Sequence, residues 1–171
     1  AGRTLACELD GTVECLVLDA PGTLRHGDAD IPFAGVLSVD TGLAGRRQGL
    51  ASRTTAAAIA RDRADGALVS GLGMFDQGFY DKLGFGSGPY EHVVSFNPQH
   101  LRVDRRARAP RRLGAGDLPA MLANRLAAPR RHGAVVFAQP GLLLFAWGVK
   151  GNTLGLGYFD GPGGALSHHI A

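Results

Sequence analysis

The first forty residues alternate between apolar and polar positions in extended runs that are separated by turns. The runs TLACEL (4–9) and TVECLVLDA (12–20) flank Asp10 and Gly11, and an Asp-Gly pair between alternating runs is a strong signal for a β-hairpin. A third run, IPFAGVLSVDT (31–41), is rich in small and β-branched residues. The chain is therefore predicted to begin as a meander of antiparallel strands.

The pattern changes to that of a helix after the third run. From about Arg47 onward the chain has small Ala and Thr residues that suit close packing on a sheet, and Gly66 supplies a C-terminal stop. ALVSGLG (67–73) then has the pattern of a buried strand. Strand, loop, helix and strand in this order predict a βαβ unit, with a parallel strand pair and the helix on one face of the sheet.

The rest of the chain mixes short helical and extended patterns. We expect a short helix within 75–85, a strand at 90–96 and a solvated linker over the arginine-rich stretch 101–113. A helix over 117–128 then precedes strands, which are predicted at 134–139, 142–149, 152–159 and 165–170. The predicted fold class is α+β, with a mixed, mainly antiparallel central sheet, flanking helices and the start of a second, similar unit.

Length and composition narrow the class of protein. The 171 residues can bury one sizeable core plus the beginning of a second. No apolar run reaches the roughly 18 residues of a membrane-spanning helix, and no signal-peptide pattern opens the chain, so we expect a cytoplasmic protein without a membrane partner. The net charge of +3 comes almost wholly from arginine, much of it local: Arg102, Arg105, Arg106, Arg108, Arg111, Arg112, Arg130 and Arg131.

The two cysteines, Cys7 and Cys15, flank the predicted turn at Asp10 and Gly11. A two-residue turn would place their side chains on opposite faces of the sheet, whereas a longer loop could bring them opposite each other. Two cysteines do not make a disulfide framework, so we do not expect them to be joined.

The loop between the third strand and the first helix has the composition of a phosphate-binding loop. Arg46, Gly49 and Ala51 follow an Arg-x-x-Gly-x-Ala spacing. Such a loop can direct successive backbone N–H groups, together with the positive end of the helix dipole, at a phosphate or pyrophosphate. A capping arrangement without a ligand is the alternative, and the spacing matches neither a Walker loop nor Gly-x-Gly-x-x-Gly.

A second motif, FYDKLGFG (79–86), places Tyr80 on a short helix that ends at Gly84 and Phe85. Together the two motifs resemble the cofactor motifs of the GNAT N-acetyltransferases. The resemblance implies acetyl-CoA as co-substrate, a primary amine as acceptor and Tyr80 as the general acid. Without this role, Tyr80 would be a core or rim aromatic residue beside Phe79 and Phe85. From the residues themselves we expect no metal.

The resemblance also assigns the residues that bind the cofactor. Strand 35–41 would splay from strand 67–73, and the pantetheine arm would lie between them. Val39, Asp40 and Thr41 would then line the pantetheine. The backbone amides of the loop would hold the pyrophosphate: Arg46, Arg47, Gln48, Gly49, Leu50, Ala51 and Ser52.

The base that takes the proton of the amine is left open. Asp40, Glu91 or His92 could act through water, although an exposed carboxylate or a structural histidine explains each of them as well. His168 and His169 are expected to be strand residues rather than metal ligands.

Within the superfamily the chain is similar to the enhanced intracellular survival type of acetyltransferase. The resemblance lies in AGVLSVDTGLAGRRQGLASR (34–53), FYDKLGFG (79–86) and DRRAR (104–108). It implies a hexamer of chains that join two GNAT-like domains to a sterol-carrier-like domain, and acceptors that include the amines of lysine and of aminoglycosides. Residues 1–113 would be the acetyl-CoA-binding domain without its first strand and helices, and 114–171 part of the second domain. We therefore expect a piece of a longer protein.

Two other functions compete with the enzyme. The first is a GNAT-like module that binds CoA or a partner without catalysis. The second is a nucleic-acid-binding module that uses the arginines of 102–112, which we disfavour because no aromatic residues that could stack on bases interleave with them.

Overall fold

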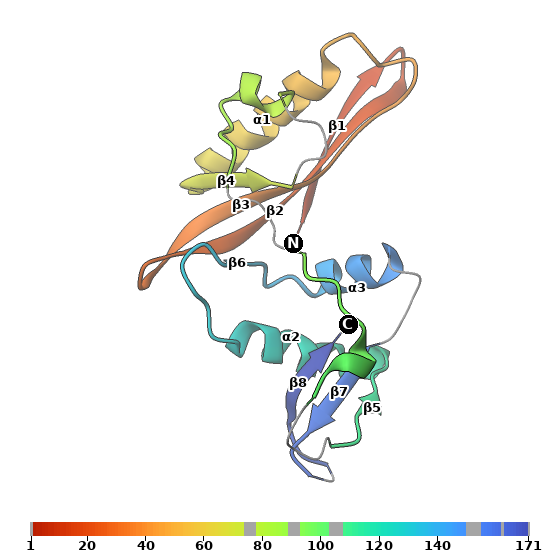
Figure 1. Ribbon diagram of the computed structural model, residues 1–171. Helices are drawn as coiled ribbons and strands as arrows, with labels where there is room; N and C mark the ends of the chain where they lie inside the picture. The colour runs from red at the N-terminus through yellow and green to blue at the C-terminus, as the bar shows by residue number, and fades with distance from the viewer. Residues whose placement is uncertain are drawn as a thin grey trace.

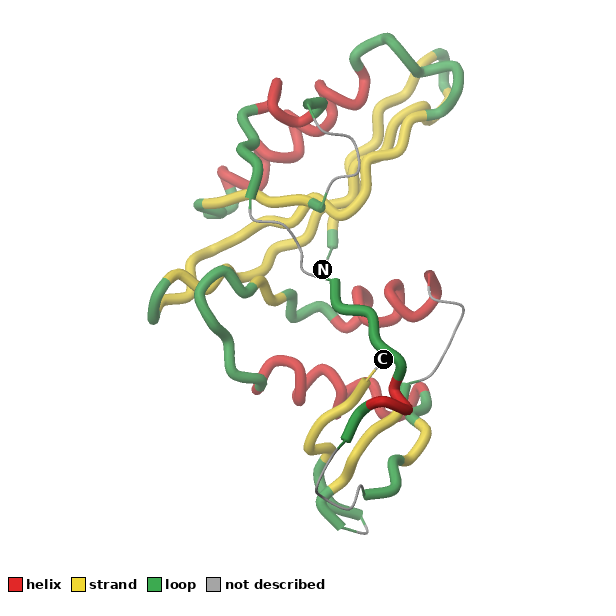
Figure 2. The backbone as a smooth tube through the Cα atoms, viewed as in Figure 1, coloured by secondary structure: helices red, strands yellow, loops and turns green. Residues whose placement is uncertain are grey.

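Two sheets with packed helices make up the part of the protein that the computed structural model describes, residues 2–73, 78–88, 93–102, 108–149, 155–161 and 163–170 (Figure 1). The larger sheet has the order β1-β2-β3-β4, with β6 beside β2, and the smaller has the order β5-β7-β8. Figure 2 shows α1 on one face of the long strands and the smaller sheet at the other end of the molecule.

The larger sheet begins with β1 (Arg3–Leu9), β2 (Thr12–His26) and β3 (Ala29–Thr41), which pair antiparallel in sequence order. Asp10 and Gly11 form the predicted two-residue turn, both with positive φ. The parallel strand β4 (Val69–Leu72) adds to β3, and β6 (Val135–Val136) pairs with β2. The predicted α+β class with a mixed, mainly antiparallel sheet is confirmed.

Helix α1 (Leu50–Ala64) connects β3 to β4 and packs against β1, β2 and β3. The hydrophobic cluster between helix and sheet consists of the buried Val17, Val36 and Ala58, and Val39 packs against them. Ala58 is fully buried, which shows why small residues along this helix suit its close approach to the sheet. The predicted βαβ unit is therefore present.

The two cysteines lie opposite each other, contrary to the expectation for a two-residue turn. Cys7 pairs with Cys15, because the register shifts between Cys7 and Glu8 and leaves Glu14 as an extra residue on β2. This β-bulge therefore places Cys7 opposite Cys15, whereas the turn alone would have placed them on opposite faces of the sheet. Both thiols are free, with Cys15 buried and Cys7 half-buried.

An ion-pair network ties the C-terminal end of α1 to the sheet. Asp19 and Asp62 are 0% and 1% exposed, respectively. Arg61 contacts Asp19 at 2.6 Å, while Arg3 contacts Asp19 at 3.1 Å and also pairs with Asp62 and Asp65. Burial, followed by the negative charge of Asp19, raises the pKa of Asp62.

The second part of the chain has its own core. Leu113, Met121 and Leu166 are buried together, where α2 (Leu118–Ala127) meets the smaller sheet. That sheet consists of β5 (Arg111–Arg112), β7 (Leu156–Phe159) and β8 (Leu166–Ile170).

Three short 3₁₀ turns occur in the described part of the chain: η1 (Tyr80–Leu83), η2 (Pro98–His100) and η3 (Ala115–Asp117). The division of the chain at residue 113 stays a prediction.

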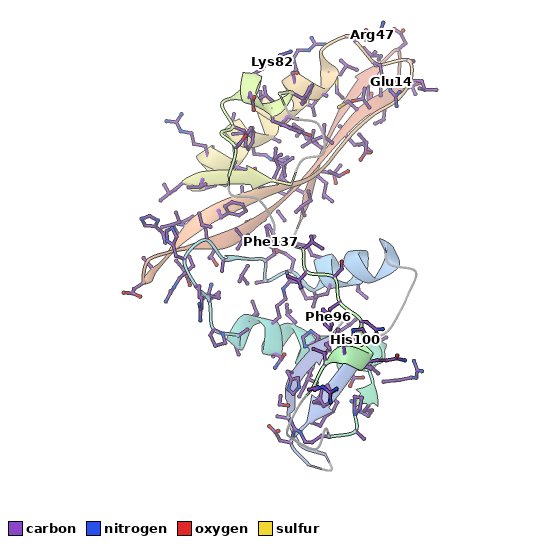
Figure 3. All side chains as sticks on the ribbon, viewed as in Figure 1. Glu14, Arg47, Lys82, Phe96, His100 and Phe137 are labelled. Atoms are coloured by element: carbon purple, nitrogen blue, oxygen red, sulfur yellow. The ribbon has the colours of Figure 1, made fainter. Side chains whose placement is uncertain are left out.

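Phe137 fixes this second part to the larger sheet (Figure 3). Its ring lies over Gly22 and Gly35, where a Cβ atom on either glycine would collide with it, and 6.0 Å from the ring of Phe33. Arg130 adds an ion pair of 2.6 Å to Asp30 on β3. The two glycines thus leave the space that the aromatic ring fills.

Three predicted elements differ from the structure. The apolar run 142–149 lies in helix α3 (Pro140–Val149), because an unbroken apolar run does not distinguish a strand from a helix and Pro140 favours a helix start. Of the strand predicted at 90–96, residues 93–96 are irregular, and Val93 is 80% exposed. The linker at 101–113 contains β5 and the buried Leu113.

Candidate functional site

The loop that joins β3 to α1 is set by two residues with left-handed backbone. Arg47 has φ of 60° and Gly49 has φ of 74°, and Gly49 directly precedes the helix. The first helical hydrogen bond runs from the N–H of Arg53 to the carbonyl of Gly49, at 3.1 Å. The helix begins at Leu50, directly after the turns that span 43–49.

The N-terminus of α1 has no protein cap among the described residues. No side chain bonds its first N–H groups, and its first turn contains no acidic residue. The N–H groups of Leu50, Ala51 and Ser52 precede the first helical bond, so they have no partner within the helix. Arg46 and Arg47 are exposed beside them. This arrangement concentrates positive charge and hydrogen-bond donors at one point.

A cavity of about 320 Å³ opens at this helix end. Phe79, from the segment just before η1, closes one side of it. The other lining residues are all among those predicted to bind the cofactor, apart from Gly45: Thr41, Gly45, Arg46, Arg47, Gly49, Leu50, Ala51 and Ser52. The predicted loop residues and the segment of the second motif thus meet around one cavity.

Gln48 does not line this cavity. Its side-chain amide donates a hydrogen bond to the backbone carbonyl of Ala44 at 2.7 Å, and its backbone carbonyl accepts one from the guanidinium group of Arg53 at 3.4 Å. The first contact lies within the loop, and the second joins the loop to α1. The side chain of Gln48 therefore stabilises the loop, although its backbone amide belongs to the predicted set.

The strand β3 extends beyond its parallel partner. The pairing with β4 runs from Phe33 to Val36, and within the described residues the segment 37–41 pairs with β2 alone. Val39 packs toward α1, and the exposed Asp40 accepts a hydrogen bond from Ser38. Neither Val39 nor Asp40 lines the cavity at the helix end. Among the described residues, no strand pairs with this free edge of β3 beside the cavity.

Tyr80 begins η1 and packs against two aromatic rings. Its ring meets Phe79 edge-on at 4.9 Å and Phe85 at 6.0 Å, and Gly84, with φ of 86°, ends the turn. Tyr80 lines a second cavity of about 460 Å³ that is bounded by β4 and by Ile59 of α1. The structure therefore places Phe79 in the cavity at the helix end and Tyr80 in the neighbouring one.

The remaining predicted residues lie elsewhere. Glu91 and His92 fall outside the described residues, as do Arg105 and Arg106. His169 Nδ1 donates a hydrogen bond to the side-chain oxygen Oδ1 of Asn124 at 2.9 Å, and burial followed by the charge of Arg125 lowers the pKa of His169. Both His168 and His169 are residues of β8, as predicted. No cluster of metal-ligating side chains occurs in the described part of the chain.

Two described arginines of the basic stretch, Arg108 and Arg111, have side-chain partners inside the protein. Arg108 pairs with Asp160 at 3.1 Å, and Arg111 forms a two-pronged pair with Asp117. Arg111 also lies 4.3 Å above the ring of Phe159. These contacts give the two arginines a structural role.

Two residues of the site escaped the sequence analysis. Phe79 stands next to Tyr80 in the second motif, so its aromatic character was a usable signal. Glu14 contacts the loop from β2: its carboxylate accepts the N–H of Gly45 at 3.0 Å. No local signal marks Glu14, because its position depends on the β-bulge.

Comparison with other proteins supports the fold. No family model matches the sequence, and no curated protein matches it. The structure is similar to a mutant of the BH1408 protein from Bacillus halodurans, with 12% identity over 56% of this chain and a TM-score of 0.50. That match covers 66% of the Bacillus halodurans chain, just under two thirds of its length.

Two N-acetyltransferases also align. A ribosomal-protein-alanine N-acetyltransferase from Brucella melitensis biovar Abortus shares 14% identity over 56% of this chain and 72% of its own, with a TM-score of 0.46. An aminoglycoside N-acetyltransferase in complex with CoA shares 15% identity over 57% of this chain and 67% of its own, also at 0.46. The Bacillus halodurans match shows a shared α+β fold.

Among the described residues, no helix is long and apolar enough to cross a membrane.

Proposed function

We propose that this chain belongs to a GNAT-type N-acetyltransferase that moves the acetyl group of acetyl-CoA to a primary amine. The observation that supports this most is the uncapped N-terminus of α1 with Arg46 and Arg47 beside it. Cations near the positive end of a helix dipole are unfavourable for the free protein. An anionic ligand reverses the sign of that interaction, so the arrangement favours a pyrophosphate.

The cavity at the helix end would hold the pyrophosphate of CoA. The N–H groups of Leu50, Ala51 and Ser52 would donate to its oxygens, and the exposed guanidinium groups of Arg46 and Arg47 would add charge-assisted bonds. Gly49 leaves open space where a side chain would point, since a Cβ atom there would meet nothing within 4 Å. A phosphate can therefore approach the backbone closely.

The pantetheine arm would continue along the open edge of β3. The backbone of 37–41 is not paired with β4, so its edge groups can bond an extended amide chain as a neighbouring strand would. In this arrangement Thr41 lies next to the cavity for the pyrophosphate, and Asp40 and Val39 follow toward the thioester.

In the proposed reaction the neutral amine attacks the thioester carbonyl directly. The C–N bond forms, the C–S bond breaks, and the departing thiolate of CoA takes a proton from the hydroxyl of Tyr80. The amine nitrogen loses its extra proton to a base, for which Asp40 is the described candidate. No covalent enzyme intermediate is needed.

The resemblance to the enhanced intracellular survival type supports finer proposals. Lysine and aminoglycoside amines are the acceptors to try first, and a cytoplasmic hexamer is the assembly to look for. A CoA-binding module without catalysis remains the competing outcome of the test below.

The test combines acetyl-CoA binding with transfer to a panel of amines. Tyr80→Phe should bind acetyl-CoA as the wild type does and lose about 10²- to 10³-fold in the rate of transfer, because it lacks the proton donor. Tyr158→Phe is the matched control, since Tyr158 lies in β7 of the smaller sheet. Binding without transfer to any amine would identify a non-catalytic module, and full activity of Tyr80→Phe would refute the role of Tyr80.

A further inference from the structure

Glu14 is the extra residue of the β-bulge on β2, and it faces the loop that precedes α1. In Figure 3, Glu14 and Arg47 are labelled at the same tip of the larger sheet. The bulge sets this position, because the extra residue has no partner on β1 and the strand bends locally there. An irregularity in the β1–β2 hairpin thus places a carboxylate beside the loop.

Two hydrogen bonds join Glu14 to the loop. Its carboxylate oxygen Oε2 accepts the N–H of Gly45 at 3.0 Å, and its backbone carbonyl accepts the N–H of Gly42 at 2.8 Å. A Cβ atom on Gly42 would collide with the carboxylate of Glu14, and one on Gly45 would lie 3.0 Å from its Cβ. Glycine at both positions therefore lets Glu14 approach the backbone.

Gly45 is also held from the helix side. A Cβ atom on Gly45 would lie 2.9 Å from the Cδ1 atom of Leu50, which is buried. Glu14 and Leu50 thus fix the start of the loop between strand and helix. Downstream of this fixed point, the backbone reverses at Arg47 and Gly49 and reaches the helix.

We propose that Glu14 is the positioning residue of the phosphate loop and sets the affinity for the pyrophosphate of CoA, an inference that rests on the proposed function. By accepting the Gly45 N–H, it holds the loop in the conformation that directs the later N–H groups at the ligand. The role needs an acceptor oxygen rather than a negative charge. A glutamine can therefore replace Glu14, and an alanine cannot.

The first readout needs no ligand. Hydrogen exchange of the amides of 42–49 should be faster in Glu14→Ala and close to wild type in Glu14→Gln. Glu8→Ala is the matched control, because Glu8 is an exposed glutamate next to the same bulge. Equal exchange in Glu14→Ala and wild type would overturn the inference.

The second readout separates positioning from general loss of structure. For Glu14→Ala the KM for acetyl-CoA should rise about tenfold at unchanged kcat, by analogy with the loss of a charged hydrogen bond. With S-acetylpantetheine, a donor that lacks the pyrophosphate and nucleotide, KM should not change. A loss of rate with both donors would show a merely structural role and overturn the inference.

The two hypotheses fail in different ways. If wild-type protein does not bind CoA, the proposed function fails and the ligand assignment of Glu14 fails with it. If wild type binds CoA and Glu14→Ala binds it equally well, the proposed function stands and only the role of Glu14 is refuted.

Discussion

The charged residues at the two ends of helix α1 differ in whether they are paired within the protein. At the C-terminal end, Asp19 and Asp62 are buried, and Arg3 and Arg61 neutralise them within the protein. At the N-terminal end, the exposed Arg46 and Arg47 face a helix terminus whose first turn has no acidic residue.

We infer from this difference that the charges at the C-terminal end belong to the fold and that those at the N-terminal end bind a ligand. Guanidinium groups beside buried carboxylates offset part of the cost of burying them. Arginines beside the positive end of a helix dipole do the reverse, because they add repulsion in the free protein. The N-terminal end of α1 is therefore the proposed binding site, whereas the C-terminal end has the properties of a structural contact.

The largest effect is expected at the C-terminal end. Arg3→Met would remove the ion-pair partner of Asp62, and breaking a buried ion pair in this way should lower the free energy of unfolding by about 3 kcal/mol. Urea denaturation measures the change. Arg63→Met, at the same end of α1 but at an exposed position, should be near neutral. Equal losses in the two variants would show that the network does not stabilise the fold.

The next effect concerns the N-terminal end. Replacing Arg46 and Arg47 together by alanine should weaken CoA binding by about 1–2 kcal/mol and leave the thermal midpoint unchanged or slightly higher. The salt dependence of CoA affinity should fall as well, because charge contacts to the phosphates are removed. Calorimetry at two ionic strengths measures both. An unchanged affinity would remove these arginines from the site.

The smallest effect is a difference in pH dependence. Burial and Asp19 raise the pKa of Asp62, so the folded state binds more protons than the unfolded state between the ordinary pKa near 3.8 and the raised value. The contribution of Asp62 to stability is therefore present below pH 3.8 and is lost as the pH rises through the raised pKa. Asparagine does not ionise, so the free energy of unfolding of Asp62→Asn, measured by urea denaturation at several pH values, should fall less than that of wild type between pH 4 and 7. Parallel curves would contradict the assignment.

The sequence predicted the elements that local signals define. The Asp10–Gly11 turn, the helix stop near Gly66 and the βαβ order each depend on neighbouring residues, and all are present. The loop 46–52 could also be predicted, because its glycine and its arginines lie next to each other in the chain. Of the residues that line the cavity at the helix end, only Gly45 and Phe79 were not among the predicted ones.

What the sequence did not reveal depends on tertiary contacts. The bulge at Glu14 shifts the register of β1 and β2, and no pattern within either strand shows it. Phe137 packs on Gly22 and Gly35 across a separation of about one hundred residues, so no local pattern relates them. The helix over Pro140–Val149 was mistaken for a strand because an apolar run has no period.

The central claim, that an anionic cofactor binds at the N-terminal end of α1, is tested most directly by calorimetric titration with CoA of two glycine variants. Gly49 and Gly66 stand at opposite ends of the helix, with φ of 74° and 99°, and a Cβ atom at either would meet nothing within 4 Å. Glutamate should therefore impose similar backbone strain at both positions. We predict that Gly66→Glu binds CoA as wild type does and that Gly49→Glu does not; equal CoA affinity in the two variants would contradict the claim.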